Sequence, residues 1–566
     1  MGINTDAHHM IQPSPPTASP PPLLSVRDLS ISFRTDDGVV RAVDQISFDV
    51  HKGEILGLVG ESGSGKTVTG MSLLRLVPSP PGQIQSGHIL FEGRDLARLP
   101  TEALRSIRGR EIGVIFQEPM TALSPLHPVG RQLVEAQQLH DPRLPHAKAW
   151  THAIEWLERV GIADAEERAR AYPHQFSGGM RQRVMIAMTL MLNPKLIIAD
   201  EPTTALDVTI QKQIFELILQ MKRRDTALLF ITHDMGVIWE LCDRVLVMKD
   251  ARIVESGTAE TIFNRPEIPY TRKLLDAVPR LTDPSRPPAT EQADVPLLAA
   301  RDVCTWFPVR RGIFARTTGY IKAVDGVSLT IPPGQVFGLV GESGSGKTTL
   351  GRTILGLDPM RSGVLHYRGQ PLNPNSSRAM YPYRRHLQMI FQDPFSSLNP
   401  RLNICDLLTE GPALHGLLQG EKEELAAHWL EEVGLAADMM NRYPHEFSGG
   451  QRQRICVARA MAVQPDFIVC DEAVSALDVT VQAQIIDLLM ALKDKYNLSY
   501  LFISHDLSVI KRIADHVAVM RHGRFVEEGH PNEVIGAPQH PYTRQLIAAV
   551  PVPGDPARRQ RLAART

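Results

Sequence analysis

The feature that most constrains the fold of this chain is an octapeptide that occurs twice. Gly60–Thr67 reads Gly-Glu-Ser-Gly-Ser-Gly-Lys-Thr, and Gly341–Thr348 repeats the same eight residues. Both match G-x-x-x-x-G-K-[ST] at every fixed position, which is the pattern of a phosphate-binding loop. The apolar runs 55–59 and 336–340 predict a buried parallel strand before each loop, and a helix is expected after it.

The residue types of the loop indicate its chemistry. The glycines let backbone N–H groups turn toward phosphate oxygens, and the N-terminus of the following helix adds positive potential. Lys66 is expected to reach the terminal phosphates, and the Thr67 hydroxyl to bind Mg²⁺. Lys347 and Thr348 hold the same places in the second loop. The predicted cofactors are therefore ATP and Mg²⁺.

Other short sequences also occur twice, at nearly the same separation, so the chain is one module written twice. Each module alternates strand-like runs with helical segments, which predicts an α/β core with a helical middle section. The lysines of the loops are 281 residues apart, Gln117 and Gln392 are 275 apart, Ser177 and Ser448 and also Asp200 and Asp471 are 271 apart, and His233 and His505 are 272 apart.

A proline-rich stretch with little apolar content separates the modules. It covers 279–297 and predicts a linker. We expect one domain over 23–278 and a second over 298–552. The proline-rich tail 1–22 is expected to be disordered, and 553–566 forms a C-terminal tail.

The composition excludes several classes of protein. The formal net charge of −1 at 566 residues gives no general attraction to nucleic acid or acidic membranes. Five cysteines without a C-x-x-C pair argue against a disulfide framework, a zinc site or an iron–sulfur cluster, and suit a reducing cytosol. The sequence contains no run of 18 apolar residues and no recognisable signal peptide. A role at a membrane would therefore need another chain to cross it.

An apolar run in each module ends in Asp-Glu. Ligands of an open α/β sheet bind at the carboxyl ends of its strands. We expect Asp200 and Asp471 to hold Mg²⁺ through water. Glu201 and Glu472 are expected to polarise the attacking water, a role worth roughly 10²–10⁴-fold in rate. One such pair alone fits solvated acids at a strand end equally well; the phosphate loop in the same module favours catalysis.

Two further motifs can be explained either by a structural role or by a functional one. His233 and His505 each follow an apolar run; such a histidine is commonly structural, but here it can also contact the γ-phosphate and sense it. Ser177–Gly179 and Ser448–Gly450 each open an apolar helix. They are either simple N-caps or a second anion site in each module.

Taken together, these motifs resemble the ATP-binding subunit of an ATP-binding-cassette (ABC) transporter with both cassettes fused. The resemblance covers about Leu24 to Pro551. It implies two tandem cassettes that pair head to tail within one chain, in place of a homodimer. ATP on Lys66 would then be covered by Ser448–Gly450, and ATP on Lys347 by Ser177–Gly179.

The resemblance also implies roles for three more pairs: an aromatic ring that stacks on adenine, a glutamine that contacts Mg²⁺ and relays to the membrane partner, and an aspartate in the loop that couples the two sites. These pairs are Phe33 and Phe307, Gln117 and Gln392, and Asp207 and Asp478.

The predicted site residues form three groups. Nucleotide binding is assigned, besides those three pairs, to Gly60, Glu61, Ser62, Gly63, Ser64, Gly65, Lys66, Thr67, Gly341, Glu342, Ser343, Gly344, Ser345, Gly346, Lys347 and Thr348, and to Ser177, Gly178, Gly179, Ser448, Gly449 and Gly450. The predicted metal ligands are Thr67, Gln117, Asp200, Thr348, Gln392 and Asp471. The predicted catalytic residues are Glu201, His233, Glu472 and His505.

Some positions depart from the family pattern. Both Ser-Gly-Gly motifs follow Phe where Leu is usual, and the first ends in Met180 where Gln is usual. Ala473 stands where Pro202 follows the glutamate of the first module. None of these changes removes a catalytic group, so we expect two competent ATP sites.

Each module ends in a Pro-Tyr-Thr-Arg motif, at Pro269–Arg272 and Pro541–Arg544. The motif resembles the dipeptide and oligopeptide importer branch of the family, and the fused layout resembles bacterial glutathione or dipeptide importer ATPases. Physically, the motif is explained by a helix start that packs back on its cassette.

The predicted function is therefore ATP hydrolysis that drives import of a dipeptide, oligopeptide or glutathione. The expected partners are two transmembrane permease subunits and a periplasmic or lipid-anchored solute-binding protein, at the cytoplasmic face of the bacterial inner membrane, with no nucleic acid. Two alternatives stay open: a soluble twin-cassette ATPase acting on ribosomes or DNA, and the ATPase of an ABC exporter. The substrate cannot be read from the cassettes because they do not touch it.

Overall fold

The computed structural model describes residues 21–35, 38–117, 122–203, 207–286, 295–311, 316–475 and 477–555. Most of the expected tails lies outside these residues, and so do 287–294 of the expected linker. The coupling loops are described only in part, since 204–206 and 476 also lie outside.

The first copy contains two sheets. An antiparallel sheet has the order β2-β1-β4-β5. A second sheet has the order β10-β9-β3-β8-β7-β6, and all its neighbours pair in parallel except β9 and β10. The strands are β1 (Leu24–Thr35), β2 (Gly38–Val50), β3 (Ile55–Val59), β4 (Gly82–Phe91), β5 (Arg94–Asp95), β6 (Ile112–Ile115), β7 (Leu196–Asp200), β8 (Ala227–Ile231), β9 (Arg244–Lys249) and β10 (Arg252–Thr258).

The helices of the first copy follow the expected alternation, and α4 to α7 form its helical section. Each helix buries one face against its neighbours, as Trp156 and Leu157 of α5 do. The helices are α1 (Lys66–Ser72), α2 (Thr101–Ile107), α4 (Val129–His140), α5 (His146–Arg159), α6 (Ala165–Ala169), η1 (Pro173–Gln175), α7 (Gly178–Leu190), α8 (Val208–Met221), α9 (Met235–Leu241), α10 (Ala259–Asn264) and α11 (Pro269–Asp276).

The second copy repeats this plan, with sheets of order β12-β11-β14-β15 and β16-β17-β18-β13-β19-β20. Its strands are β11 (Leu298–Arg311), β12 (Arg316–Ile331), β13 (Val336–Val340), β14 (Ser362–Tyr367), β15 (Gln370–Leu372), β16 (Leu387–Ile390), β17 (Phe467–Asp471), β18 (Ser499–Ile503), β19 (His516–Arg521) and β20 (Arg524–Gly529). Its helices are α12 (Lys347–Ile354), α13 (Ser377–Met380), η2 (Tyr381–Tyr383), α14 (Pro394–Ser397), α15 (Ile404–Leu414), α16 (Lys422–Glu432), η3 (Ala437–Asn441), η4 (Pro444–Glu446), α17 (Gly449–Met461), α18 (Val479–Tyr496), α19 (Leu507–Ile513), α20 (Pro531–Val534) and α21 (Pro541–Ala549).

The strand order explains where the functional motifs meet. In the first copy β3 lies beside β8, and β8 beside β7, all in parallel. Every residue of β7 and β8 is buried, as expected for strands covered on both faces. Because the carboxyl ends of parallel strands lie at one edge, the phosphate loop after β3, the carboxylates after β7 and the histidine after β8 share that edge. The second copy places β13, β18 and β17 in the same way.

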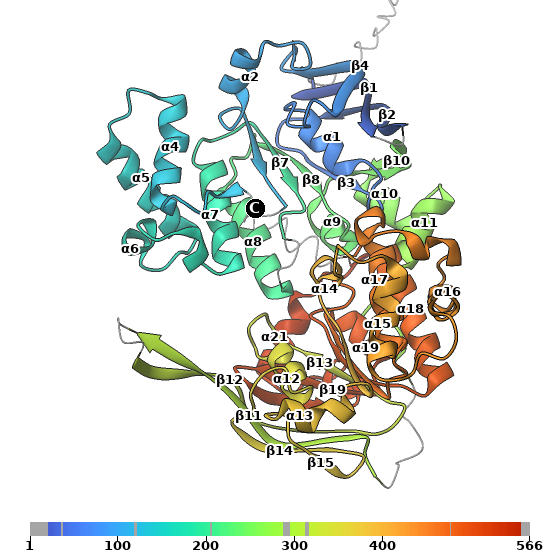
Figure 1. Cartoon of the computed structure of the whole chain (residues 1–566). Helices are drawn as coiled ribbons and strands as arrows, with labels where there is room; N and C mark the ends of the chain where they lie inside the picture. Colours follow the sequence, from blue (N-terminus) through green and yellow to red (C-terminus); the bar gives the residue numbers. More distant parts are fainter. Residues whose placement is uncertain are drawn as a thin grey trace, which may run out of the picture.

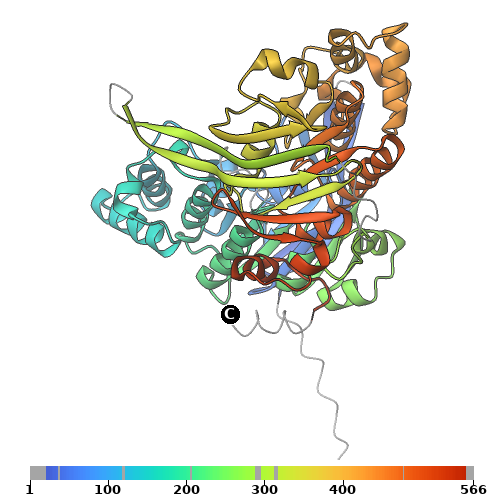
Figure 2. The same cartoon turned by 90° about the horizontal axis from the view of Figure 1, so that it is seen from below.

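The two copies face each other in opposite orientations. Figure 1 shows helices α4 to α6 of the first copy on one side of the molecule and α15 and α16 of the second copy on the other. Figure 2 shows the same separation from below, with the long hairpin of β11 and β12 extending away from the body. The copies contact each other through Asp478 and Ser62 and through Asp207 and Ser343.

The two copies also exchange their C-terminal ends. The segment after α11 crosses to the second copy, where the Lys511 ammonium donates to the Leu281 carbonyl and Arg286 pairs with Asp494 at 3.1 Å. The segment after α21 crosses to the first copy, where the Trp239 indole donates to the Asp555 carbonyl at 3.2 Å. The start of the expected linker is therefore docked on the second copy and is not a free spacer. We call the segments after α11 and after α21 the two straps.

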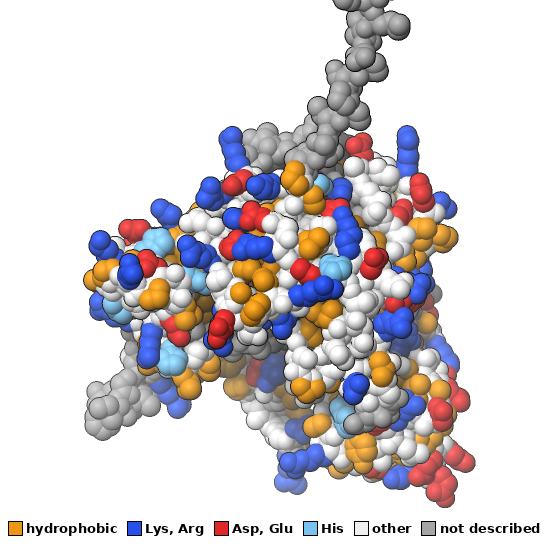
Figure 3. Space-filling view, turned by 90° about the horizontal axis from the view of Figure 1, so that it is seen from above, with side chains coloured by type: hydrophobic (Ala, Val, Ile, Leu, Met, Phe, Trp, Pro, Cys, Tyr) orange, Lys and Arg blue, Asp and Glu red, His pale blue; other side chains and the backbone are white. Residues whose placement is uncertain are grey.

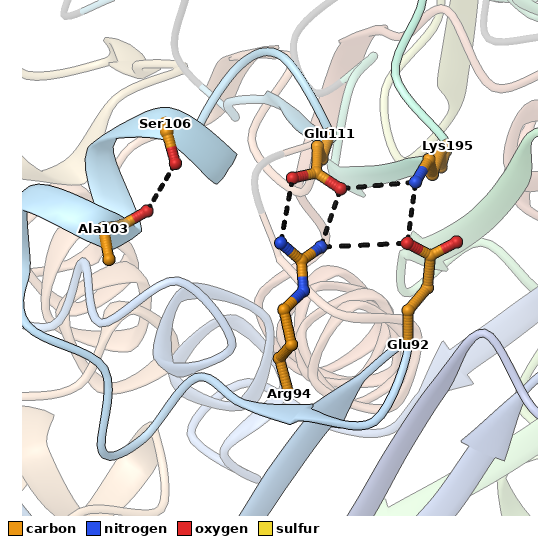
Figure 4. A network of polar contacts seen from close by, with 6 residues as sticks. All are labelled: Glu92, Arg94, Ala103, Ser106, Glu111 and Lys195. Carbon is orange, nitrogen blue, oxygen red and sulfur yellow. Dashed lines mark hydrogen bonds and ion pairs between the residues drawn. The ribbon is translucent and has the colours of Figure 1, made fainter.

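A charged network joins the two sheets of the first copy (Figure 4). Arg94, at β5, makes two hydrogen bonds to Glu111, and Lys195 contacts Glu92 at 2.6 Å and Glu111 at 3.3 Å. In the second copy the charges are reversed: Asp466 stands in place of Lys195 and lies 2.8 Å from His386 Nδ1 and 2.9 Å from Arg368. Exposed pairs of this kind each contribute about 0.2–1 kcal/mol.

The surface agrees with the balanced composition. Figure 3 shows basic and acidic side chains interspersed over the face that it presents, with apolar side chains scattered among them. In the described part of the chain, no helix combines the length and the apolar character needed to cross a membrane.

Candidate functional site

The phosphate loop of each copy needs glycine at two positions. Gly60 has φ 155°, and a Cβ there would lie 2.2 Å from the Met248 carbonyl oxygen. Gly65 has φ 100°, and a Cβ there would lie 2.2 Å from the Ala42 carbonyl oxygen. The corresponding distances in the second loop are 2.3 Å at Gly341 and 2.0 Å at Gly346. Neighbouring backbone therefore excludes any side chain at these positions.

The lysine of each loop is folded back over the loop itself. The Lys66 ammonium donates to the carbonyls of Gly60 and Glu61, both at 2.8 Å. Lys347 does the same in the second copy, at 2.7 and 2.9 Å. Burial lowers the pKa of both lysines, although nearby carboxylates act in the opposite direction. The structure thus places a desolvated ammonium against the carbonyls of each loop.

A hydroxyl and a carboxylate meet beside each loop. Thr67 Oγ1 donates to Asp200 Oδ1 at 3.1 Å, and Thr348 Oγ1 donates to Asp471 Oδ1 at 2.8 Å. Burial raises the pKa of Asp200 to about 6, and it raises the pKa of Asp471 as well. A buried carboxylate with a raised pKa next to a hydroxyl forms an oxygen donor set, which is the kind that Mg²⁺ prefers.

The glutamate after each aspartate has an unusual backbone. Glu201 has φ 43° and Glu472 has φ 47°, in the left-handed region that non-glycine residues rarely adopt. The N–H of Glu201 is held by the Ile231 carbonyl at 2.8 Å, and that of Glu472 by the Ile503 carbonyl at 3.0 Å. The strained turn directs both carboxylates away from the strand and toward the edge of the sheet.

Each glutamate binds the glutamine and the histidine of its own copy. Gln117 Nε2 donates to Glu201 Oε2 at 3.0 Å, and His233 Nδ1 lies 3.1 Å from Glu201 Oε1. In the second copy Gln392 Nε2 donates to Glu472 at 2.8 Å, and His505 Nδ1 lies 3.5 Å from the same carboxylate. The predicted catalytic and metal-binding side chains therefore form one cluster in each copy.

The pKa values of the histidines reflect this contact. Burial acts to lower the pKa of His233 and His505, but the bonded glutamate raises it overall. Burial acts to raise the pKa of Glu472, but His505 brings it below its usual value. Because an ionised carboxylate only accepts hydrogen bonds, a hydrogen bond from His505 to ionised Glu472 requires a proton on His505 Nδ1.

The aspartates of the coupling loops cross between the copies. Asp478 Oδ1 caps its own helix α18 by accepting the Val481 N–H at 3.0 Å, and Asp478 Oδ2 accepts the Ser62 N–H of the first phosphate loop at 3.2 Å. Asp207 of the first copy makes the equivalent two contacts. It accepts the Ile210 N–H of its own helix α8 at 3.0 Å and the Ser343 N–H of the second phosphate loop at 3.3 Å. Each phosphate loop is thus completed by a side chain of the other copy.

The two Ser-Gly-Gly motifs form helix N-caps. The Ser177 hydroxyl accepts the Met180 N–H at 3.3 Å, and the Ser448 hydroxyl accepts the Gln451 N–H at 3.4 Å. Both serines are exposed. Among the described residues that line the pocket around Lys347, Asp207 comes from the first copy and Ser177 is absent. The structure therefore brings the coupling aspartates to the phosphate loops but does not bring Ser177 to the Lys347 pocket.

The predicted adenine-stacking residues lie on the antiparallel sheets. Phe33 is half-buried against the core, opposite Val40 on β2. Phe307 lies opposite Ile321, which lines the pocket around Lys347 together with Tyr320. Sequence reasoning did not single out Tyr320; its place in the extended second hairpin, 27 residues before Lys347, was the available signal.

Sequence reasoning also missed a contact to the phosphate loops. The hydroxyls of Tyr270 and Tyr542 accept the N–H groups of Glu61 at 3.2 Å and Glu342 at 3.1 Å. Both tyrosines belong to the Pro-Tyr-Thr-Arg motifs, which were expected to pack back on their own cassettes. The occurrence of a tyrosine at the same place in both modules was the signal available.

Comparison with known proteins identifies two family patterns. Residues 43–204 and 324–475 match the pattern described as "ABC transporter". Residues 254–310 and 526–566 match the pattern described as "Oligopeptide/dipeptide transporter, C-terminal region".

Similar proteins are known over nearly the full length of the chain. It is 49% identical over 531 residues to the peptidoglycan transport ATP-binding protein YejF of Agrobacterium fabrum, covering 93% of this chain and 96% of that protein. It is 46% identical over 567 residues to the glutathione import ATP-binding protein GsiA of Escherichia coli K12, covering 95% and 91%. A solved dimeric ATP-binding cassette with ADP and Pi bound matches 42% of this chain and 98% of its own, at 24% identity and a TM-score of 0.38.

Proposed function

This chain belongs to the ABC transporter family and carries two ATPase cassettes, and from that premise we propose that they hydrolyse ATP at two sites shared between them. The single observation that carries the proposal is the reciprocal contact of Asp478 with the Ser62 N–H and of Asp207 with the Ser343 N–H. A phosphate loop whose N–H group is held by the opposite cassette responds directly to how the two cassettes are placed.

Within each site, the residues of this chain divide the work. The loop N–H groups and Lys66 bind the phosphates, while Thr67, Asp200 and Gln117 would hold Mg²⁺. Mg²⁺, when bound, supplies positive charge next to the phosphate oxygens. The oxygen donor set found beside the loop fits this ion. Thr348, Asp471, Gln392 and Lys347 take the same roles in the second site.

The glutamates carry the hydrolytic step. Glu201 and Glu472 polarise the attacking water and accept its proton, each held in place by the histidine bonded to its carboxylate. The histidines orient the glutamates and contact the γ-phosphate. Because Glu201 is also bonded to Gln117, a movement of the glutamine is transmitted to the base.

Nucleotide binding closes the pair of cassettes. In the closed state Ser448–Gly450 cover the nucleotide on Lys66, and Ser177–Gly179 cover that on Lys347. The N-termini of α17 and α7 then add their positive potential to the phosphates. The reciprocal aspartate contacts at the phosphate loops support this head-to-tail closure.

The solute carried is peptide-like. The match to the oligopeptide and dipeptide transporter C-terminal region supports this assignment, and so do the relatives named for peptidoglycan transport and glutathione import. The chain docks on two permease subunits that work with a periplasmic or lipid-anchored solute-binding protein, at the cytoplasmic face of the bacterial inner membrane. Hydrolysis then drives import.

The catalytic assignment is tested by replacing both bases, Glu201→Gln with Glu472→Gln. We expect ATP binding to persist and steady-state hydrolysis to fall by about 10²-fold or more, since the water loses its base. Glu166→Gln, at an exposed helix position, is the matched control and should keep full turnover. Substantial hydrolysis by the double variant would remove the role given to the glutamates.

The transport assignment is tested by fractionation. We expect the chain to associate with membranes only when its permease subunits are co-expressed. In proteoliposomes that contain the permease, the solute-binding protein and its peptide ligand should stimulate hydrolysis. Co-sedimentation with ribosomes, without any dependence on a permease, would instead support the soluble twin-cassette alternative.

A further inference from the structure

The same tyrosine contact occurs in both cassettes. The hydroxyl of Tyr270, at the start of α11, accepts the N–H of Glu61, the second residue of the first phosphate loop. The hydroxyl of Tyr542, at the start of α21, accepts the N–H of Glu342 in the second loop. Each contact joins segments about 200 residues apart, at 209 and 200 positions.

The helix that carries each tyrosine is firmly anchored at its start. The Glu255 carboxylate, on β10, accepts the N–H groups of Glu267 at 2.8 Å and Ile268 at 3.3 Å, and the Thr271 hydroxyl. The Glu527 carboxylate, on β20, accepts the N–H groups of Gln539 at 2.7 Å and His540 at 3.1 Å. A carboxylate at a helix N-terminus satisfies the free N–H groups and the helix dipole. The backbone that carries the tyrosine is therefore fixed in position.

Each tyrosine ring contacts a basic side chain at the end of a strand that lies next to the loop, β9 in the first cassette and β19 in the second. Lys249 Nζ lies 5.0 Å from the Tyr270 ring centre, and Arg521 Cζ lies 4.6 Å from that of Tyr542. Lys249 directly follows Met248, whose carbonyl oxygen abuts Gly60. The first turn of the loop is thus enclosed between the end of β9 and the tyrosine hydroxyl, and the second cassette repeats this.

The hydroxyl has the chemistry that the contact needs. Burial raises the pKa of both tyrosines to about 12, so each remains neutral at any physiological pH. A neutral hydroxyl accepts the loop N–H without bringing negative charge next to phosphate. In the first cassette the Thr271 hydroxyl donates to the Glu255 carboxylate that anchors the helix, while the Tyr270 hydroxyl contacts the loop. A phenylalanine would fill the same volume but would lack this bond.

We propose that Tyr270 and Tyr542 are positioning residues that hold the first turn of each phosphate loop in its nucleotide-binding shape. The inference rests on the proposed nucleotide sites. The bonds fix the N–H of the second loop residue, and the N–H groups that follow it then point into the loop before nucleotide arrives. Such preorganisation raises affinity because less ordering remains to be done on binding.

The test uses the full chain with one site silenced at a time. In the Lys347→Ala background only the first site takes up a fluorescent ATP analogue, and Tyr270→Phe should weaken its binding by about three- to tenfold, the worth of one hydrogen bond. Tyr542→Phe should leave that site unchanged. In the Lys66→Ala background only the second site binds the analogue. There Tyr542→Phe should weaken binding and Tyr270→Phe should leave it unchanged. With both sites intact, the KM for ATP should rise while kcat is retained.

Tyr500→Phe is the matched control. Its hydroxyl donates to the Leu489 carbonyl at 2.9 Å in the second core, away from both loops. It should lower the Tm without changing nucleotide affinity in either background. Unchanged affinity in the Tyr270→Phe and Tyr542→Phe proteins would overturn the inference while leaving the ATP sites in place. Equal losses in both backgrounds would also overturn it, because they would indicate a general effect on folding. A parent protein that binds no nucleotide would overturn the proposed sites themselves.

Discussion

Two buried aspartates, Asp200 and Asp471, stand at the ends of the equivalent strands β7 and β17, each with a hydroxyl as partner. A carboxylate in this position is more costly to ionise than one in water, because burial removes its hydration. The same property suits it to a cation, since a divalent ion offsets the burial of the negative charge. The site is therefore built at some expense to the stability of the nucleotide-free protein.

This cost predicts a pH dependence of stability that Asp200→Asn should weaken, while Asp471 continues to contribute to it. The pKa of Asp200 is raised from 3.8 to about 6, so the folded state retains a proton that the unfolded state has lost. Stability should thus fall as pH rises through this window, by about 3 kcal/mol at most. In EDTA and without nucleotide, we expect Asp200→Asn to raise the Tm at pH 7.5 and to flatten its change from pH 4.5 to 7.5.

The control for that experiment is an acid outside the site. Glu166 is exposed on α6, and Glu166→Gln should keep the parent's pH dependence. A pH profile of Tm that is the same in Asp200→Asn and the parent would show that another group is responsible.

At the scale of elements, the helices α7 and α17 begin alike but are not capped alike. In α17 the Gln451 side chain accepts the Ser448 N–H at 3.1 Å while the Ser448 hydroxyl accepts the Gln451 N–H, which completes a capping box. In α7 the residue at the corresponding position is Met180, which cannot return the bond. The departure from the family pattern noted in the sequence thus has a local structural consequence.

Exchanging Met180 and Gln451 measures how much the second hydrogen bond of the capping box contributes to stability. Met180→Gln should stabilise the first cassette by about 0.5–1 kcal/mol, and Gln451→Met should destabilise the second by a similar amount. Denaturant unfolding followed through each cassette's own tryptophans separates the two effects. If both substitutions shift stability in the same direction, the capping account is wrong.

At the scale of the whole molecule, the two cassettes hold each other at two levels. The aspartates Asp207 and Asp478 join them at the phosphate loops, and the exchanged C-terminal segments join them behind α9 and α19. A Cβ on Gly236, in α9, would lie 2.7 Å from Pro551, so this segment is packed closely against the first cassette. Pro279 of one strap and Pro551 of the other line a single pocket between the cassettes, together with His233 and His505.

Removal of one strap should therefore loosen the pair. We expect truncation after Ala549 to raise the radius of gyration in solution scattering by a few ångström above the roughly 24 Å of a compact chain of this length. Truncation after Asp555 keeps the contact to Trp239 and should scatter as the full chain does. Identical curves for the two truncations would show that the strap does not hold the cassettes.

Much of the site could be predicted because its motifs depend on short-range structure. A glycine loop between a strand and a helix, and carboxylates that directly follow an apolar strand, are encoded within a few residues, and the parallel sheet brings them together. The expectations of two fused cassettes, an α/β fold and a role in a peptide-type importer are confirmed by the family matches and the relatives. The domain limits and the individual residue roles stay predictions.

The sequence by itself determined which chemistry each cassette can perform, because the residues for that chemistry lie next to elements whose form is set locally. Only the tertiary structure decided which distant groups complete the site. The hydroxyl of Tyr270 meets the N–H of Glu61, and the carboxylate of Asp478 meets that of Ser62, 416 residues away. These meetings depend on how helices and cassettes pack, and no local pattern in the chain specifies the distance between two surfaces that touch only after folding.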